Sequence, residues 1–153
     1  MIANSTFSPI YQYTKALMVA LGYRDNMTRL HSERVLSLSE AMGAACGLFG
    51  QELLTLKIGA AFHDIGKIGI PDGVLLKPGR LDAAEWELMR RHSDIVQKIL
   101  LSTGLAGAEA AALVIRHHHE HFDGNGYPDG LAGEEIPLAS RIIAIVDSCA
   151  AKP

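Results

Sequence analysis

Histidines next to carboxylates are the residues of this sequence most suited to chemistry. His63 and Asp64 stand side by side at the end of an apolar run that begins near Leu53, and Lys67 follows three residues later. Imidazole nitrogen and carboxylate oxygen together bind divalent metals such as iron, manganese and zinc. A single His-Asp pair is more often a helix-surface pair or a core contact, so the metal interpretation depends on further ligands elsewhere in the chain.

Further nitrogen ligands are present. All 7 histidines lie between positions 31 and 121, and four of them fall in one run, His117-His118-His119-Glu120-His121. His31 and His92 lie inside expected helices, where each is also compatible with an ordinary surface or core position. Asp147 interrupts the apolar series of the last expected helix, and a carboxylate there is costly unless it is paired or bound to a metal. Together these residues predict a metal site.

The elements that position these residues are helices. Apolar residues recur at helical spacing, and no stretch alternates convincingly as a strand does. Asp82 with Glu85 is a variant of the capping box, and dense Pro and Gly predict an ordered loop over residues 68–80. We expect an all-α bundle of about six helices around the metal site. The expected helices cover residues 9–21, 26–45, 51–62, 82–103 and 108–118, and a last one begins at residue 137.

The expected helices predict where individual residues lie. It puts His63 and Asp64 on a helix, and it puts His92 near the middle of the helix over residues 82–103. Trp86 and Met89 then lie on the apolar side of that same helix. The glycine-rich stretch after His121 turns the chain back over the metal cavity.

Composition and charge limit the classes of function. The chain has 153 residues, 48% of them hydrophobic, which fits one helical domain. Its net charge of -3 and the lack of a basic block give no general attraction to DNA or to an anionic membrane surface. Cys46 and Cys149 stand outside any motif, so we expect buried thiols in a reducing compartment. Neither a membrane span nor a signal peptide is evident, and the expected location is the cytoplasm.

The motifs resemble those of a known family. The sequence is similar to the HD superfamily of metal-dependent phosphohydrolases, and within it to the HD-GYP domains that hydrolyse the bacterial second messenger cyclic di-GMP. The similarity covers most of the chain from about residue 24 onward. It rests on residues 63–71 (HDIGKIGIP), 76–81 (LKPGRL), 118–120 (HHE), 123–128 (DGNGYP), 130–131 (GL), 133–137 (GEEIP) and 141–142 (RI).

The resemblance implies a ligand set of seven residues around two divalent metal ions. His31, His63, Asp64 and Asp147 would surround one metal, and Asp64 would bridge to a second metal held by His92, His118 and His119. His117 and His121 are then flanking residues, although the choice among the three consecutive histidines is the least secure part of this set. Iron and manganese are the metals that we expect first, with zinc as the alternative.

The resemblance also implies a mechanism. Two metals about 3.5 to 4 Å apart would activate a water and polarise the phosphoryl oxygens of a diester. Lys67 would bind substrate and stabilise the departing ribose oxygen. Gly126 and Tyr127 would wall the substrate pocket, with Tyr127 either contacting substrate or anchoring its own loop.

Three departures from the family pattern carry expectations. Met27 stands where some members have a glutamate for a third metal, which favours a two-metal centre. Val96 replaces a frequent glycine, which would alter helix packing near His92. Residues 148–153 replace a family motif that grips phosphate, so we expect either a shortened domain or a weakened substrate site.

The leading hypothesis is therefore a phosphodiesterase that opens cyclic di-GMP to linear pGpG, GMP or both. The alternatives are a catalytically impaired signalling module that keeps the metal cage, and a hydrolase for another phosphorylated nucleotide. We expect residues 1–23 to form an N-terminal extension and helix, and residues 24–153 to form the HD-GYP domain without its C-terminal helices. A homodimer or a regulatory protein is the expected partner.

Overall fold

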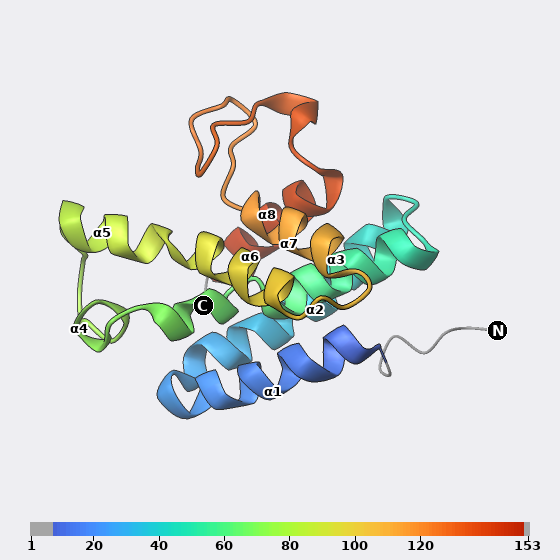
Figure 1. Ribbon diagram of the computed structural model, residues 1–153. Coiled ribbons are helices and arrows are strands. Elements are labelled where there is room, and N and C mark those ends of the chain that lie inside the picture. The colour runs from blue at the N-terminus through green and yellow to red at the C-terminus, as the bar shows by residue number, and fades with distance from the viewer. Residues whose placement is uncertain (1–7, 152–153) are drawn as a thin grey trace.

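The computed structural model describes residues 8–151, and every regular element in that range is a helix (Figure 1). This confirms the all-α expectation, with seven helices longer than one turn where about six were expected. The helices are α1 (Pro9–Arg24), α2 (Asn26–Ala45), α3 (Gly50–Phe62), α4 (Asp72–Leu75), α5 (Ala83–Arg90), α6 (His92–Ser102), α7 (Ala108–Arg116) and α8 (Leu138–Ala150). Two short 3-10 helices, η2 (Ile65–Gly69) and η3 (Gly133–Glu135), complete the set.

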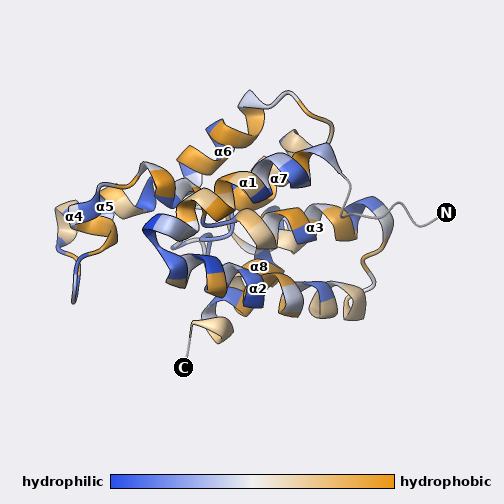
Figure 2. Ribbon diagram, turned by 90° about the horizontal axis from the view of Figure 1, so that it is seen from below, coloured by the Kyte–Doolittle hydropathy of each residue, from blue (hydrophilic) through white to orange (hydrophobic). Residues whose placement is uncertain are grey.

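Helix α3 lies at the centre of the bundle and joins its two apolar clusters. Ile58 and Phe62 belong to a cluster with residues of α1, α6 and α7, whereas Leu56 and Ala60 belong to a second cluster with residues of α2, α7 and α8. Figure 2 shows hydrophobic residues recurring along α3, α6 and α7, as expected for helices that pack on one another. The C-terminal end of α3 is thereby fixed in the interior of the protein.

The expected helix over residues 82–103 is wrong, because the chain forms two helices that meet at Arg91. The capping box of Asp82 and Glu85 is present at the start of α5. At its end, the Arg91 N–H donates to the Leu88 carbonyl, three residues back, which is a 3-10 turn rather than a continued α-helix. His92 is therefore the first residue of α6 and not the middle of a helix.

Two further expectations need correction. Cys46 and Cys149 are exposed thiols, not buried ones, because Cys46 follows the last residue of α2 and Cys149 lies on the outer side of α8. Residues 68–80 are ordered as expected, but they include the end of η2 and the single turn of α4. The Arg24 guanidinium holds this segment by donating to the Ile68 carbonyl at 2.7 Å and to the Asp72 carboxylate at 2.8 Å.

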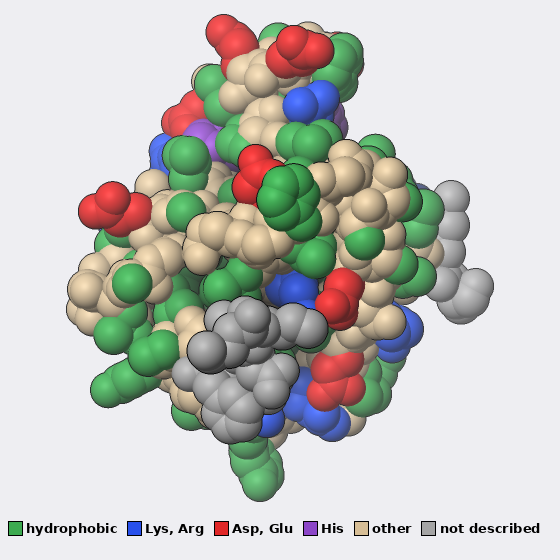
Figure 3. All heavy atoms as spheres, turned by 90° about the vertical axis from the view of Figure 1, so that its right-hand side faces the viewer, with side chains coloured by type: hydrophobic (Ala, Val, Ile, Leu, Met, Phe, Trp, Pro, Cys, Tyr) green, Lys and Arg blue, Asp and Glu red, His purple; other side chains and the backbone are tan. Residues whose placement is uncertain are grey.

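Charged side chains of both signs are mixed on one face of the protein. On the face shown in Figure 3, Lys and Arg side chains lie close to Asp and Glu side chains rather than in a broad basic patch. Within residues 8–151, no helix combines the length and the apolar character that crossing a membrane would require.

Candidate metal centre

The centre begins where α3 ends. His63 follows the last residue of α3, and Asp64 precedes the first residue of η2. The expectation that both residues sit on a helix is therefore wrong, because they occupy the junction between an α-helix and a 3-10 helix. Both are buried, with 0% and 5% of their surface exposed.

A glycine brings this junction against α6. A Cβ atom on Gly66 would lie 1.9 Å from the His92 carbonyl oxygen, so no larger residue fits there without a backbone shift. Val96, which is fully buried, packs on the same glycine, with a methyl group 2.8 Å from that Cβ position. The close approach sets Asp64 and His92 beside each other.

Five histidine rings form a connected group around the junction. Successive ring centroids lie 5.7 Å apart for His31 and His63, 5.2 Å for His63 and His118, 5.6 Å for His118 and His92, and 5.0 Å for His92 and His119. Residues far apart in the sequence thus share one small volume. The two expected flanking histidines, His117 and His121, are not in this group of contacts.

Three of these rings are oriented in the same way by the backbone. The Nδ1 atoms of His63, His92 and His118 lie 2.8, 2.7 and 2.5 Å from the carbonyl oxygens of Ala60, Met89 and Ile115. Each carbonyl belongs to the last turn of a helix that has just ended, where carbonyls lack their full set of helical partners. A proton held on Nδ1 leaves the Nε2 lone pair of each ring free to bind a cation.

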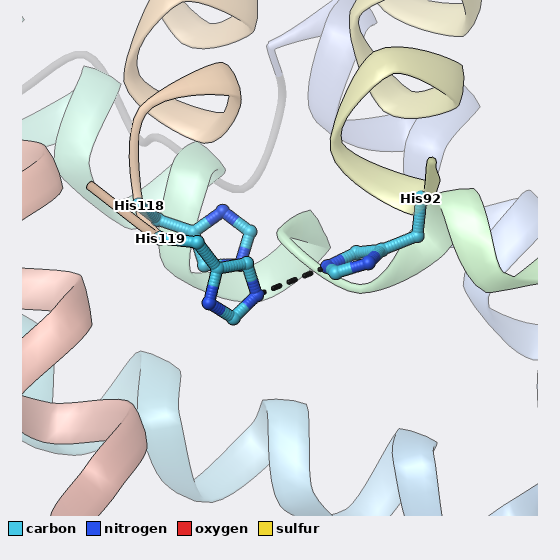
Figure 4. A group of neighbouring side chains, drawn as sticks. All are labelled: His92, His118 and His119. Atoms are coloured by element: carbon cyan, nitrogen blue, oxygen red, sulfur yellow. Dashed lines mark hydrogen bonds between the residues drawn. The ribbon is translucent and has the colours of Figure 1, made fainter. Parts of the chain in front are cut away.

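The free nitrogens fit a metal ion. The Nε2 atoms of His63 and His118 are buried and have no hydrogen-bond partner in the described part of the chain. His119 Nε2 lies 3.2 Å from His92 Nε2, and Figure 4 shows His118 and His119 directed toward His92. Ligand atoms of His92, His118 and His119 all lie within 4.8 Å of one another, as do those of His31, His63 and Asp64. Buried lone pairs gathered in this way are costly unless a cation or proton binds them.

Carboxylates lie between and beside the two groups. Asp64 Oδ2 lies 3.2 Å from His63 Nε2, and Asp64 Oδ1 lies 3.6 Å from His92 Nε2, so its two oxygens face different groups. Asp147 Oδ1 lies 2.5 Å from His31 Nε2 and 3.5 Å from His63 Nε2. The structure thus brings together all seven residues expected as ligands.

The charge states of Asp64 and of three histidines suit cation binding, whereas His63 holds a proton that a cation would replace. Burial lowers the pKa of His92 and His118, and it lowers the pKa of His119 to about 3, so these three rings are neutral near pH 7. Burial also lowers the pKa of His63, but the Asp64 and Asp147 carboxylates outweigh burial and raise that pKa to about 10. His63 is therefore protonated near pH 7 in the absence of a cation, and a cation that binds Nε2 takes the place of this proton. Burial raises the pKa of Asp64, but the positive charges of His63 and Lys67 outweigh burial and hold this pKa well below its usual value. Asp64 therefore stays ionised.

Lys67 and a cavity lie beside the carboxylates. Lys67 Nζ donates to Asp64 Oδ2 at 3.3 Å. Both residues line an open cavity of about 500 Å³, which His31, His92, His119, Tyr127 and Asp147 also line. Residues that were not predicted as site residues complete the wall, namely Met27, Thr28, Arg34, Leu81, Trp86, Met89 and Ala151. The position of Arg34, one turn after His31, is the sequence signal that could have found it.

The loop that contains Gly126, Tyr127 and Pro128, which we call the Gly-Tyr-Pro loop, covers one side of the histidine group. The Tyr127 ring stacks on His119, with centroids 4.9 Å apart, and the Arg90 guanidinium lies 4.3 Å from the Tyr127 centroid. Burial raises the pKa of Tyr127 to about 12. A Cβ atom on Gly126 would lie 2.2 Å from the His121 nitrogen, so the loop packs directly on the backbone of the histidine run.

Charged residues outside the centre hold the same loop. Glu120 accepts hydrogen bonds from the backbone N–H groups of Asp129 and Leu131 at 2.7 and 3.1 Å. The Asp129 carboxylate in turn binds the Arg116 guanidinium at 2.9 Å and lies 2.8 Å from His117 Nε2. Since the carboxylate oxygens of Glu120 and Asp129 already have hydrogen-bond partners, these two residues stabilise the loop.

Comparison with known families identifies the fold. A family model described as "HD domain" matches residues 11–151. The chain belongs to the HD domain family. This agrees with the resemblance drawn from the motifs.

Curated relatives of this HD domain carry phosphodiesterase names. It is 42% identical over 128 residues to the cyclic di-GMP phosphodiesterase response regulator RpfG of Xanthomonas campestris, covering 84% of the chain and 34% of that protein. It is 39% identical over 139 residues to a cyclic di-GMP phosphodiesterase of Thermotoga maritima, covering 91% and 38%. It is 38% identical over 128 residues to the 3'3'-cGAMP-specific phosphodiesterase 2 of Vibrio cholerae, covering 84% and 24%. The chain therefore spans well under half the length of these relatives.

Proposed function

We propose that this HD domain is a metal-dependent phosphodiesterase of the HD-GYP type that hydrolyses cyclic di-GMP. The observation that carries the proposal is the convergence of five histidines and two aspartates beside one cavity, which three of these histidines and both aspartates line. Behind this wall, the buried Nε2 atoms of His63 and His118 have no hydrogen-bond partner within residues 8–151. The names of the relatives support a cyclic dinucleotide as the substrate class. The expected products are linear pGpG, GMP or both.

The proposed ligand set divides between two divalent cations. His31, His63 and Asp147 would hold one, and His92, His118 and His119 would hold the other, with Asp64 shared because its oxygens face both groups. Iron or manganese is the proposed metal and zinc the alternative, since all three accept imidazole with carboxylate. When bound, such a pair supplies an activated water and a positive charge next to the phosphoryl oxygens.

Lys67 has the proposed role of a catalytic cation. It lies at the cavity wall against Asp64, where its ammonium group can bind a phosphate oxygen or stabilise the departing ribose oxygen. Asp64 keeps Lys67 in place, and the ionised carboxylate suits a cation-binding role. Arg34, which lines the same cavity, has no hydrogen bond or ion pair within residues 8–151 and can meet a second phosphate.

The Gly-Tyr-Pro loop completes the proposed pocket. Gly126 permits the close packing of the loop on the histidine run, and Tyr127 braces His119. Between the two roles that the sequence leaves open for Tyr127, these contacts favour the anchoring role. A direct contact of Gly126 with substrate remains part of the proposal.

The test combines metal content with turnover. Protein purified without oxygen should contain about two metal ions per chain by elemental analysis and should hydrolyse cyclic di-GMP. The Asp64→Asn variant should lose most of its bound metal and most of its hydrolysis of cyclic di-GMP, because Asp64 is the ligand that the two cations share. Glu109→Gln, which makes the same chemical change on an exposed part of α7, should keep both.

The outcome that contradicts the proposal is protein with about two metal ions that leaves cyclic di-GMP intact. A panel of other nucleotide mono- and diesters then decides whether the domain hydrolyses a different phosphate ester. Turnover of 3'3'-cGAMP in preference to cyclic di-GMP would keep the reaction and change the substrate.

A further inference from the structure

Trp86 is a large aromatic side chain on the wall of the metal-centre cavity. It lines the same cavity as Asp64 and Lys67, and 47% of its surface is exposed. The sequence places it on the apolar, inward side of a long helix, but α5 contains no buried residue. Its indole therefore faces the space in which substrate would bind rather than the core.

Tyr127, the other large aromatic ring of this wall, already has two partners. His119 stacks on it at an interplanar angle of 18°, and the Arg90 guanidinium lies over it. A ring in contact with both groups has little face left for a ligand. Trp86 has no ring or cation contact within residues 8–151, so its indole face is available.

The backbone under Trp86 is held firmly. The preceding residue, Glu85, closes the capping box by accepting from the Asp82 N–H at 2.8 Å, while the Glu85 N–H donates to the Asp82 side chain at 2.8 Å. Glu85 also accepts from Lys77 Nζ at 2.5 Å. At the other end of α5, the Met89 carbonyl holds the Nδ1 atom of His92. The helix that presents the indole thus also supports a candidate metal ligand.

The surroundings of the indole suit a flat, apolar ligand. Met89, one turn further along α5, and Leu81 line the same cavity, and neither carries a charge. Aromatic side chains bind nucleobases by stacking, which tolerates any base because every base has a π-face. A nucleotide site needs contacts for the phosphate and for the base. The proposed phosphate chemistry at Asp64 and the indole of Trp86 in the same cavity provide one contact each.

We propose that Trp86 is the stacking platform for one purine base of the nucleotide whose phosphodiester lies at the metal centre. The proposal rests on the proposed function for the location of the phosphate. It adds the contact that recognises the base and assigns it to α5 rather than to the Gly-Tyr-Pro loop.

The first experiment uses the indole itself as the probe. Trp86 is the only tryptophan of the chain, so fluorescence excited at wavelengths that its 4 tyrosines do not absorb reports on this residue alone. The metal-loaded chain is titrated with GMP and, separately, with ribose 5-phosphate, with excitation where guanine does not absorb. Stacking predicts saturable quenching by GMP and none by ribose 5-phosphate. Equal effects of the two compounds, or no effect of GMP, would overturn the proposal.

The second experiment measures cyclic di-GMP hydrolysis by variants. Trp86→Leu keeps an apolar side chain without a π-face and should raise KM about 5- to 150-fold, with kcat little changed. Trp86→Phe should recover most of the wild-type KM. Phe49→Leu removes an aromatic ring that is 77% exposed but does not line this cavity, and it should leave KM unchanged.

The two experiments separate this proposal from the proposed function. Hydrolysis that continues in Trp86→Leu with a wild-type KM overturns the stacking proposal and leaves the phosphodiesterase intact. The opposite result is also informative. If the protein does not hydrolyse cyclic di-GMP, yet its Trp86 fluorescence is quenched by GMP and not by ribose 5-phosphate, the stacking proposal stands and the proposed phosphodiesterase function is contradicted.

Discussion

The five histidines of the centre are held in two different ways. His63, His92 and His118 lie just beyond helix ends, and each ring binds a last-turn carbonyl through Nδ1. His31 lies inside α2 and His119 lies in the loop after α7, and neither Nδ1 atom binds a carbonyl within residues 8–151. We call the first three the anchored histidines and the other two the unanchored histidines.

The difference has a simple origin in helix geometry. Inside a helix, the carbonyls three and four residues back already accept backbone N–H groups, so the His31 ring finds its partner elsewhere, in Asp147. Just past a helix end, those carbonyls are available to a side chain. Ending three helices at the centre therefore orients three rings before any cation binds, and orientation in advance strengthens binding.

The largest expected effect comes from comparing one histidine of each kind. His118→Ala should weaken metal affinity by more than about 100-fold, because it removes an oriented ring that contacts His63, His92 and His119. His31→Ala should cost about tenfold, because that ring is not oriented in advance and Asp147 remains. Competition with a chelator under oxygen-free conditions measures both.

The control for this pair is His121→Ala, which removes an exposed histidine outside the ring contacts. It should leave metal affinity unchanged. Equal losses in His31→Ala and His118→Ala would mean that anchoring by the backbone does not determine the strength of a ligand here.

The next effect concerns how the anchored histidines are brought to Asp64. Gly66→Ala places a methyl group 1.9 Å from the His92 carbonyl oxygen and 2.8 Å from Val96, both on buried residues. We expect the free energy of unfolding to fall by about 3 kcal/mol, at the upper end of overpacking effects. Urea unfolding of the metal-free protein measures this, so that loss of metal does not contribute.

Gly73→Ala is the matched control for this substitution. A Cβ atom at Gly73 would meet nothing within 4 Å, and this glycine lies within α4. The free energy of unfolding should change by less than about 1 kcal/mol, in the stabilising direction. If Gly66→Ala and Gly73→Ala change the free energy of unfolding equally, the close contact of Gly66 with α6 is not required for stability.

Short-range patterns predicted much of this architecture. The starts of α2, α3 and α8 fall within a residue or two of their expected positions, since caps, glycines and prolines act locally. The Asp147 assignment came from the cost of a lone carboxylate on an apolar helix face, and its contacts with His31 and His63 are the partners that argument requires.

The errors fall where tertiary contacts decide the local structure. Residues 82–103 have a helical pattern throughout, yet the chain breaks at Arg91 where the His92 carbonyl packs on Gly66. That contact joins residues far apart in sequence, so periodicity could not reveal it. The same break leaves α5 on the surface, which is why Trp86 faces the cavity rather than the core.

The smallest expected effect concerns the loop that braces the unanchored His119. The Arg116 guanidinium and then His117 lower the pKa of Asp129 to about 2. A carboxyl group whose pKa is lower in the folded than in the unfolded protein stabilises the fold above its unfolded pKa of about 3.9. That contribution declines as the pH falls toward the folded pKa.

Asp129→Asn should therefore be less stable than the wild type near neutral pH, and the gap should narrow as the pH falls below about 4. The Asp129 side chain is 38% exposed and solvent screens its ion pairs, so the gap should be less than about 1 kcal/mol and should shrink in high salt. Urea unfolding of both proteins across this pH range tests it, because carboxyl groups common to both cancel in the difference. A gap that stays constant from neutral to acid pH would mean that the Glu120 contacts, rather than the Asp129 charge, hold the loop against His119.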